Sequence, residues 1–301
     1  MAIEPWALKQ RQSLPMEAKV VFSRKRIREF YEATEGLCYV SVSGKDSLVV
    51  LDIARSLYPN IPVVFVNTKL EFPEIVSFWA KKENVETIYP DYSFKQVLEQ
   101  YGYPVVSKKV SMGISRYRNT KDDYQKHLRL HGGTNPTSGR AQARTIPIKY
   151  HHYVDAPFKI SDECCNRIKK DPLKKYHKRT GLSPITGEMA SDSQMRGQTY
   201  LQHGCNMTDR AIPKSTPLGI WMEQDSREYI KTRKLEYPSV YDMGYARTGC
   251  MFCMFGLQME MKTSGKHRFE IMAKTHPRQY EYCMDKLGIR EVLKFMRIEC
   301  P

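Results

Sequence analysis

The sequence predicts an α/β protein with a parallel, twisted sheet flanked by helices. Short apolar runs at 37–40 and 61–66 are typical of buried strands, and 85–89 is a third strand candidate. Helix-like segments separate these runs, and strands that alternate with helices form parallel βαβ units. With 301 residues, of which 41% are hydrophobic, the chain is long enough to bury such a core.

The expected elements follow one another regularly through the first third of the chain. Helices are expected at 16–33, 48–57 and 73–82, between and before the apolar runs. Beyond them, residues 110–155 are basic and poor in apolar periodicity. We therefore expect this stretch to be a loop-rich insertion or a mobile lid.

Three segments are expected along the chain. Residues 1–35 form a helical lead-in, and residues 36–235 form the main α/β domain with a basic insertion at about 104–155. Residues 236–301 form a C-terminal segment that packs on the same domain. This segment carries a C-x-x-C motif and two helices that separate near Leu287-Gly288.

The charge distribution indicates an anionic partner or a solvated surface. The chain has 48 Lys+Arg against 33 Asp+Glu, and residues 101–180 hold 18 of the basic and 6 of the acidic residues. Such a concentration binds phosphate groups on a nucleotide or along a nucleic acid, although it also keeps a protein soluble. No apolar run is long enough to cross a bilayer and no signal peptide is visible, so we expect a cytoplasmic protein without a membrane partner.

A turn rich in small residues follows the first expected strand. The segment Ser43-Gly44-Lys45-Asp46-Ser47 supplies hydroxyls, a cation and backbone N–H groups at a helix N-terminus, where phosphate binds favourably. It lacks the G-x-x-x-x-G-K-[ST] pattern of a Walker loop. The alternative is a plain strand-to-helix turn.

Four of the eight cysteines are clustered. They are the adjacent pair Cys164-Cys165 and the C-x-x-C pair Cys250 and Cys253. Four thiolates can hold an iron–sulfur cluster or a zinc ion, and spacing alone does not decide between the two. The remaining alternative is a set of packed cysteines without metal.

Several segments together resemble the phosphoadenosine phosphosulfate (PAPS) reductase family. Residues 43–47 resemble the PP-loop, S-G-G-x-D-S, of the ATP-pyrophosphatase superfamily. Residues 67–74 resemble the family segment D-T-G-x-x-F-P-E, and 187–196 resemble G-x-R-A-x-E-S-x-x-R. Residues 217–229 resemble P-L-x-x-W-x-x-x-D-x-x-x-Y. The resemblance runs from about 36 to 256 and is shared with reductase-like proteins of bacteria and phages.

The resemblance implies a PP-loop fold of the adenine nucleotide alpha hydrolase type that binds an adenylyl nucleotide. The residues implied to contact the nucleotide are Ser41, Ser43, Gly44, Lys45, Asp46, Ser47, Thr68 and Glu71. Arg196 and Lys170 are implied to face the phosphosulfate. The order C-C … C-x-x-C is similar to the [4Fe–4S] site of the adenylyl-sulfate reductases, so the four clustered cysteines are the implied ligands, with zinc as the alternative.

The C-terminal Glu299-Cys300 matches part of the family tail E-C-G-[IL]-H, whose cysteine attacks the substrate's sulfur. The resemblance implies that Cys300 is the nucleophile and that a thioredoxin-like thiol is the reductant. The rest of the tail motif is absent, and a frayed terminus is the other interpretation.

Three functional hypotheses follow from these features. The first is a [4Fe–4S] enzyme that reduces adenylyl sulfate or PAPS to sulfite. The second is an ATP-dependent sulfurtransferase that modifies tRNA or DNA, uses Mg²⁺, and binds nucleic acid through basic residues in 101–180. The third is a nucleotide-sensing protein that has lost turnover.

Overall fold

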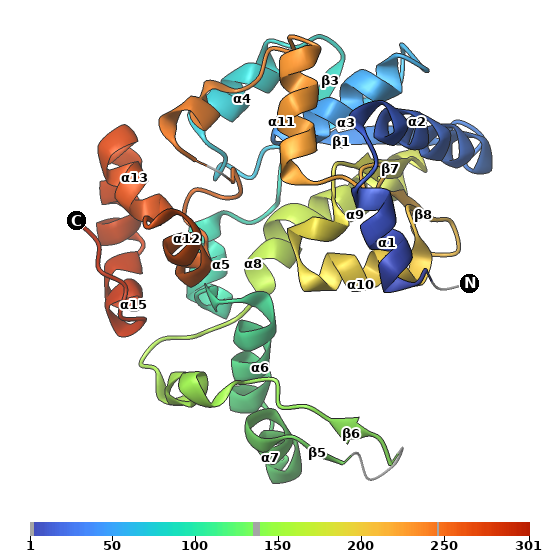
Figure 1. The fold of residues 1–301 in the computed structure, drawn as a ribbon. Coiled ribbons are helices and arrows are strands. Elements are labelled where there is room, and N and C mark those ends of the chain that lie inside the picture. The colour runs from blue at the N-terminus through green and yellow to red at the C-terminus, as the bar shows by residue number, and fades with distance from the viewer. Residues whose placement is uncertain (1–2, 135–138, 246) are drawn as a thin grey trace. The chain divides into compact units, whose positions relative to one another are not determined.

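The computed structural model describes residues 3–134, 139–245 and 247–301, which fall into two units (Figure 1). The first unit contains 1–67, 71–89 and 172–240 of the chain, and the second contains 68–70, 90–171 and 241–301.

The first unit contains a six-stranded sheet and its helices. The helices are α1 (Pro5–Gln12), α2 (Met16–Ala33), α3 (Lys45–Arg55), α4 (Pro73–Ala80), α9 (Asp171–Thr180), η3 (Ala190–Asp192), α10 (Gln194–His203) and α11 (Glu223–Thr232). The strands are β1 (Cys38–Val42), β2 (Val63–Val66), β3 (Val85–Ile88), β7 (Ser183–Thr186), β8 (Asn206–Met207) and β9 (Lys214–Ser215). The predicted α/β class with a mainly parallel sheet is confirmed.

The strand order β3-β2-β1-β7-β9-β8 creates a switch point beside β1. The chain runs from β1 outward to β2 and β3, and it returns on the other side of β1 with β7. All these strands pair in parallel, and only the edge strand β8 runs antiparallel to β9. Ligands of open parallel sheets bind outside the carboxyl ends of the strands at such a point.

The core of this sheet is apolar and nearly closed to solvent. Tyr39, Val64 and Tyr176 form a buried cluster, in which the Tyr39 and Tyr176 rings meet edge to face at 5.0 Å. Trp221 is fully buried, and its Nε1 donates to Ser23 Oγ at 2.9 Å. Packing of this kind holds the strand ends that carry the candidate loop.

The second unit is mostly helical. Its helices are α5 (Phe94–Tyr101), α6 (Lys108–Asn119), α7 (Asp123–His131), η1 (Ile148–Asp155), α8 (Glu163–Cys165), η2 (Asn166–Lys170), α12 (Leu257–Ser264), α13 (Arg268–Thr275), α14 (Pro277–Glu281), η5 (Tyr282–Lys286) and α15 (Ile289–Phe295). Its strands are β4 (Val105–Val106), β5 (Gly133–Thr134), β6 (Ala141–Gln142) and β10 (Met254–Phe255), and η4 (Ser239–Met243) lies at the boundary between the units.

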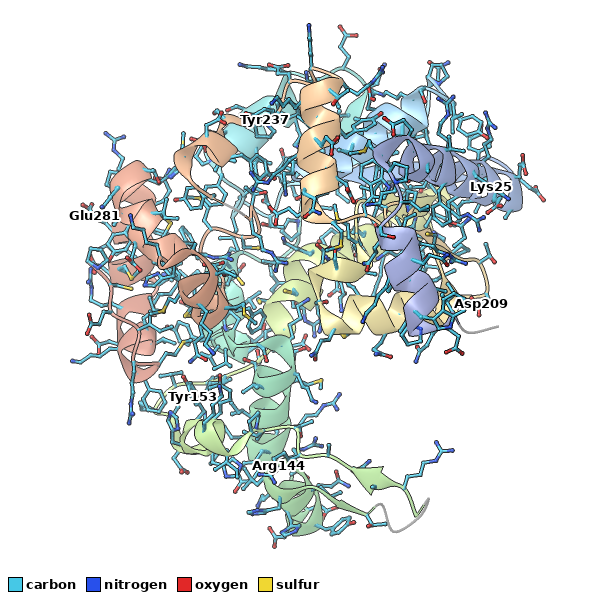
Figure 2. The ribbon with its side chains drawn as sticks, viewed as in Figure 1. Lys25, Arg144, Tyr153, Asp209, Tyr237 and Glu281 are labelled. Carbon is cyan, nitrogen blue, oxygen red and sulfur yellow. The ribbon has the colours of Figure 1, made fainter. Side chains whose placement is uncertain are left out.

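The expectation that residues 110–155 are loop-rich is wrong. This stretch contains most of α6, all of α7, the hairpin β5–β6 and η1. The guanidinium of Arg118 organises it by donating to four backbone carbonyls at 2.6–2.9 Å, those of Tyr153, Val154, Ala156 and Phe158. Tyr153, labelled in Figure 2, is buried and packs on Phe295 with ring centroids 5.4 Å apart. The insertion is therefore ordered by the hydrogen bonds of Arg118 and by packing against the C-terminal helix α15.

The C-terminal helices follow the prediction in part. The expected break at Leu287-Gly288 is present between η5 and α15, but a further break at His276 divides α13 from α14. Among the described helices, none is both long and apolar enough to cross a membrane.

Candidate functional site

The predicted phosphate loop lies between β1 and α3 in the first unit. Gly44 is the N-cap residue and Lys45 begins the helix. The Ser43 N–H donates to Ser47 Oγ at 2.7 Å, and that hydroxyl donates to the Gly44 carbonyl at 2.6 Å. Trp79 Nε1 donates to the Ser43 carbonyl at 2.6 Å. The Ser47 hydroxyl therefore bridges the backbone of the turn, and the Trp79 indole of α4 stabilises the turn through a further hydrogen bond.

Gly187 brings the segment after β7 against this loop. A Cβ added at Gly187 would lie 2.7 Å from the backbone carbon of Asp46 and the backbone nitrogen of Ser47, which is closer than real side chains approach. Since β1 and β7 are parallel neighbours, their carboxyl ends meet at the same edge of the sheet. Only glycine fits at 187 without moving the loop.

The charges at the loop are balanced rather than purely positive. Lys45 Nζ lies 3.5 Å from Asp46 Oδ1 and 3.6 Å from Glu223 Oε1. Burial raises the pKa of Asp46 above its usual value and Asp192 adds to the increase, while the charge of Lys45 opposes it. Glu223 occupies a variable position of the 217–229 motif, so the motif does not identify it as a ligand, and only its position at the start of α11 does.

Arg196, predicted to face the phosphosulfate, is paired with carboxylates. Its guanidinium contacts Asp192 closely and lies 3.7 Å from Glu188, which also pairs with Lys214 at 2.8 Å. These residues follow β7 in the first unit, as the phosphate loop follows β1. A ligand anion that binds this guanidinium therefore competes with Glu188 and Asp192.

The other predicted nucleotide and anion residues are spread over both units. Ser41 lies in β1 and Glu71 is a buried residue of the first unit. Thr68 is buried in the second unit, where its Oγ1 accepts from the Leu70 N–H at 3.3 Å. Lys170 ends the π-helical turn η2, also in the second unit. The first unit therefore contains the loop, Ser41, Glu71 and Arg196, whereas Thr68 and Lys170 belong to the second.

All four clustered cysteines lie in the second unit. Cys164 and Cys165 end α8, which packs on α5 and continues into the π-turn η2. Single π-turns are frequent at functional sites. Cys250 and Cys253 close a tight turn, in which the Cys253 N–H donates to the Cys250 carbonyl at 3.1 Å. The following strand, β10, pairs in parallel with β4, ahead of α6.

The thiols of the two pairs influence one another. A hydrogen bond with Cys165, then burial, then the nearby thiols of Cys165, Cys253 and Cys250 raise the pKa of Cys164. The same hydrogen bond lowers the pKa of Cys165, against burial and with help from Lys108 and Lys169. The pairs are therefore within electrostatic reach of each other.

Two cations that the motifs do not identify contact these cysteines. Lys108, the first residue of α6, lies close enough to Cys165 for its charge to lower the pKa of that thiol. Arg268 is buried, donates to the Cys250 carbonyl at 3.1 Å and forms a close ion pair with Glu260. Ser107 is an N-cap that accepts from the Val110 N–H, and this local signal predicts a helix that begins at Lys108. No local pattern in the sequence links Glu260 to Arg268.

The donor chemistry of this cluster fits a thiolate-bound metal centre, but its thiols are not gathered around a single point. Four thiols with cations beside them are what such a centre requires. Within 3–134, 139–245 and 247–301, however, no three His, Cys, Asp or Glu side chains are gathered as a metal site.

Cys300 lies half-buried in a tail that is held at both neighbouring residues. His267 Nε2 donates to the Glu299 carbonyl at 2.9 Å, and the Tyr280 hydroxyl donates to the Pro301 carbonyl. Burial, with a contribution from Glu270, raises the pKa of Cys300 to about 11. In this position the thiol is protonated at neutral pH and is a poor nucleophile.

Comparison with known proteins gives one family and several distant relatives. The family model described as phosphoadenosine phosphosulfate reductase domain matches residues 37–255. An adenosine 5'-phosphosulfate reductase of Deinococcus radiodurans is 24% identical over 76% of this chain and 71% of its own length. One from a Geobacillus species is 22% identical over 84% and 88%, and a phosphoadenosine 5'-phosphosulfate reductase of Gloeobacter violaceus is 26% identical over 71% and 69%.

Among solved structures, a phosphoadenylyl-sulfate reductase of Candida auris in complex with phosphate aligns with a TM-score of 0.43 at 15% identity. The alignment covers 83% of this chain and 97% of that one. The family model spans well over half of the chain, including the phosphate loop and all four clustered cysteines. The chain therefore belongs to the phosphoadenosine phosphosulfate reductase domain family.

Proposed function

We propose that this chain is a sulfonucleotide-reductase-like enzyme that binds an adenylyl nucleotide at residues 43–47. The observation that carries the proposal is the closed turn between β1 and α3, with Gly187 packed against its backbone, in a member of this family. Backbone N–H groups at the start of α3, together with Lys45, suit a phosphate or phosphosulfate group. The relatives named as adenosine 5'-phosphosulfate reductases support the substrate class.

The reaction proceeds through Cys300 in this proposal. Its thiolate attacks the sulfur of the sulfonucleotide, an S–S bond forms, and the S–O bond to the phosphate breaks so that the nucleotide leaves. A thiol of a thioredoxin-like dithiol then attacks the Cys300 sulfur and displaces sulfite. The second thiol of the donor releases Cys300, and the donor leaves as a disulfide after supplying two electrons.

We also propose that Cys164, Cys165, Cys250 and Cys253 hold a [4Fe–4S] cluster, with zinc as the alternative. When bound, such a cluster supplies an electron-transfer or electrostatic centre to the protein. The support is the donor set of four thiols with Lys108 and Arg268 beside it. Anaerobic purification followed by iron, sulfide and zinc analysis tests this assignment, and a Cys253→Ser variant serves as the comparison. Zinc without iron or sulfide would replace the cluster in the proposal.

Sulfite release tests the reductase assignment. Anaerobically purified protein receives adenylyl sulfate or PAPS with reduced thioredoxin, alongside Cys300→Ser and the loop variant Ser47→Ala. We expect sulfite from the wild type with one of the two nucleotides and none from Cys300→Ser. Nucleotide binding without sulfite release from either substrate would reject the reductase and leave the nucleotide site standing.

A second candidate is an ATP-dependent sulfurtransferase that acts on tRNA or DNA and uses Mg²⁺. The insertion supports it, because residues 104–155 contain ten Lys/Arg and three Asp, with no Glu. Arg140, Arg144 and Lys149 are exposed there. Pyrophosphate released from ATP in the presence of a nucleic acid would favour this candidate over the reductase.

A further inference from the structure

The cation of the phosphate loop already has anionic partners from two elements. Lys45 Nζ lies between Asp46 Oδ1 at 3.5 Å and Glu223 Oε1 at 3.6 Å. The Lys45 side chain is only 8% exposed, whereas that of Glu223 is 52% exposed. A ligand phosphate that approaches Lys45 from solvent therefore meets the Glu223 carboxylate.

The backbone at Glu223 is held firmly in this position. Glu223 begins α11, and two residues later Asp225 forms a buried ion pair with Lys19 at 2.6 Å. One turn further on, the Tyr229 hydroxyl donates to Asp52 Oδ2 of α3 at 2.7 Å. These contacts hold α11 against α2 and α3, and the Lys45–Glu223 pair then joins the starts of α11 and α3.

The Glu223 side chain is more weakly held than its backbone. Its carboxylate accepts from Arg227 at 2.8 Å on the same exposed helix face and pairs with Lys45. Burial tends to raise the pKa of Glu223, but Arg227 and Lys45 together lower it below the usual value. The group is therefore charged at neutral pH, and it can swing toward solvent because exposed ion pairs are weak.

We infer that Glu223 is a specificity residue that selects ligands of the loop by their charge. It competes with the ligand for Lys45, and its repulsion grows with the negative charge that the ligand brings to the loop. A dianionic adenylyl ligand such as AMP or adenylyl sulfate is less affected than tetraanionic ATP. Mg²⁺, which neutralises part of the ATP charge, reduces the discrimination. This inference rests on the proposed nucleotide site at residues 43–47.

The test compares the affinities of AMP and ATP for three forms of the full chain. Isothermal titration calorimetry in EDTA measures wild type, Glu223→Gln and the matched control Glu228→Gln. Glu228 lies on α11 and is exposed, so the control removes the same charge from the same helix. We expect Glu223→Gln to tighten AMP binding about 3-fold and ATP binding about 10-fold, with little change in the control.

The outcomes separate this inference from the proposed function. If the wild type binds AMP and Glu223→Gln gains nothing, or gains equally for both ligands, the charge selection is wrong and the nucleotide site stands. If the control gains as much as Glu223→Gln, the effect is one of net charge and the inference also fails. If no form binds either nucleotide, both the inference and the proposed site are rejected. Excess Mg²⁺ should increase ATP affinity more in the wild type than in Glu223→Gln.

Discussion

Cys300 is the residue whose chemistry depends most on its local surroundings. Burial and Glu270 raise its pKa to about 11, against an unperturbed 9.0, so about 100-fold less thiolate is present at pH 7.5 than in a free thiol. We expect alkylation of Cys300 by iodoacetamide to be correspondingly slow and to accelerate about 10-fold per pH unit up to about pH 11. Mass spectrometry of the C-terminal peptide measures the rate.

Glu270→Gln gives the internal check on this prediction. Removal of a carboxylate that disfavours the thiolate lowers the pKa of Cys300, so its alkylation at pH 7.5 should become faster. Labelling of wild-type Cys300 at the rate of a free cysteine would contradict the structure. The proposed attack on a sulfonucleotide therefore requires the tail to leave the position held by His267 and Tyr280.

A Gly187→Ala variant adds a single methyl group and thereby tests the geometry of the phosphate loop. In Gly187→Ala the added Cβ meets the backbone of Asp46 and Ser47 at 2.7 Å, so the loop must shift. We expect adenylyl nucleotide affinity to fall at least about 10-fold, because misplaced N–H groups no longer point at the phosphate. Gly197→Ala is the matched control, since its Cβ meets only the Ala190 carbonyl at 3.4 Å. Equal nucleotide affinity in the two variants would show that Gly187 does not position the loop.

The residues of the site were predictable to different degrees. The serines, Gly44 and Lys45 form a local pattern after a strand, and the adjacent and C-x-x-C cysteines are visible as spacings. Glu223 contacts Lys45 only because α11 packs on α3, which no local pattern encodes. The pairing of Arg196 with Glu188 and Asp192 likewise depends on how the segment after β7 turns.

At the level of elements, the sequence predicts best those strands and helices whose own hydrophobic pattern is strong. The strands β1 and β2 lie on mainly apolar runs and β3 is rich in β-branched residues, and the boundaries of all three lie within two residues of the prediction. The strands β8 and β9 have two residues each and carry no periodicity of their own. The sequence does not predict the helices α6 and α7, because the many basic residues obscure the helical periodicity of their apolar residues. Their N-caps, Ser107 and Asp122, were the available signals.

Among the basic residues of the insertion, Arg118 has a structural role. Its guanidinium satisfies the carbonyls of Tyr153, Val154, Ala156 and Phe158, and burial lowers its pKa. Arg118→Ala leaves these acceptors without a donor, so we expect a loss of about 2–4 kcal/mol in the free energy of unfolding of the insertion. Hydrogen exchange of the η1 amides measures this loss.

Arg116→Ala is the control for this element. Arg116 is exposed on the same helix, so its removal takes away an equal charge without the carbonyl contacts. We expect its effect on exchange to stay within about 0.5 kcal/mol. Lys at position 118 should restore only part of the protection, since an ammonium group cannot reach four carbonyls in the planar geometry of a guanidinium. Equal exchange in Arg116→Ala and Arg118→Ala would refute the structural role.

For the whole molecule, the net charge of +15 leaves open whether a polyanion binds at a particular surface or by charge alone. The insertion presents Arg140, Arg144 and Lys149, and α1 and α2 present Lys9, Lys25 and Arg28. Arg144 and Lys25 are labelled in Figure 2. Replacing either trio by alanine lowers the net charge equally, so a comparison of the two variants separates location from total charge.

Salt dependence of polynucleotide binding makes this comparison quantitative. Each phosphate contact contributes about 0.7–0.9 to the slope of log affinity against log salt. If nucleic acid binds on the insertion, the variant lacking Arg140, Arg144 and Lys149 should lose about 2–3 in slope, whereas the α1–α2 variant keeps the wild-type slope. Fluorescence anisotropy with labelled single-stranded and duplex oligonucleotides gives both slopes. Equal losses would mean that net charge alone attracts the polymer, which would remove the main support for the sulfurtransferase and strengthen the small-molecule reductase.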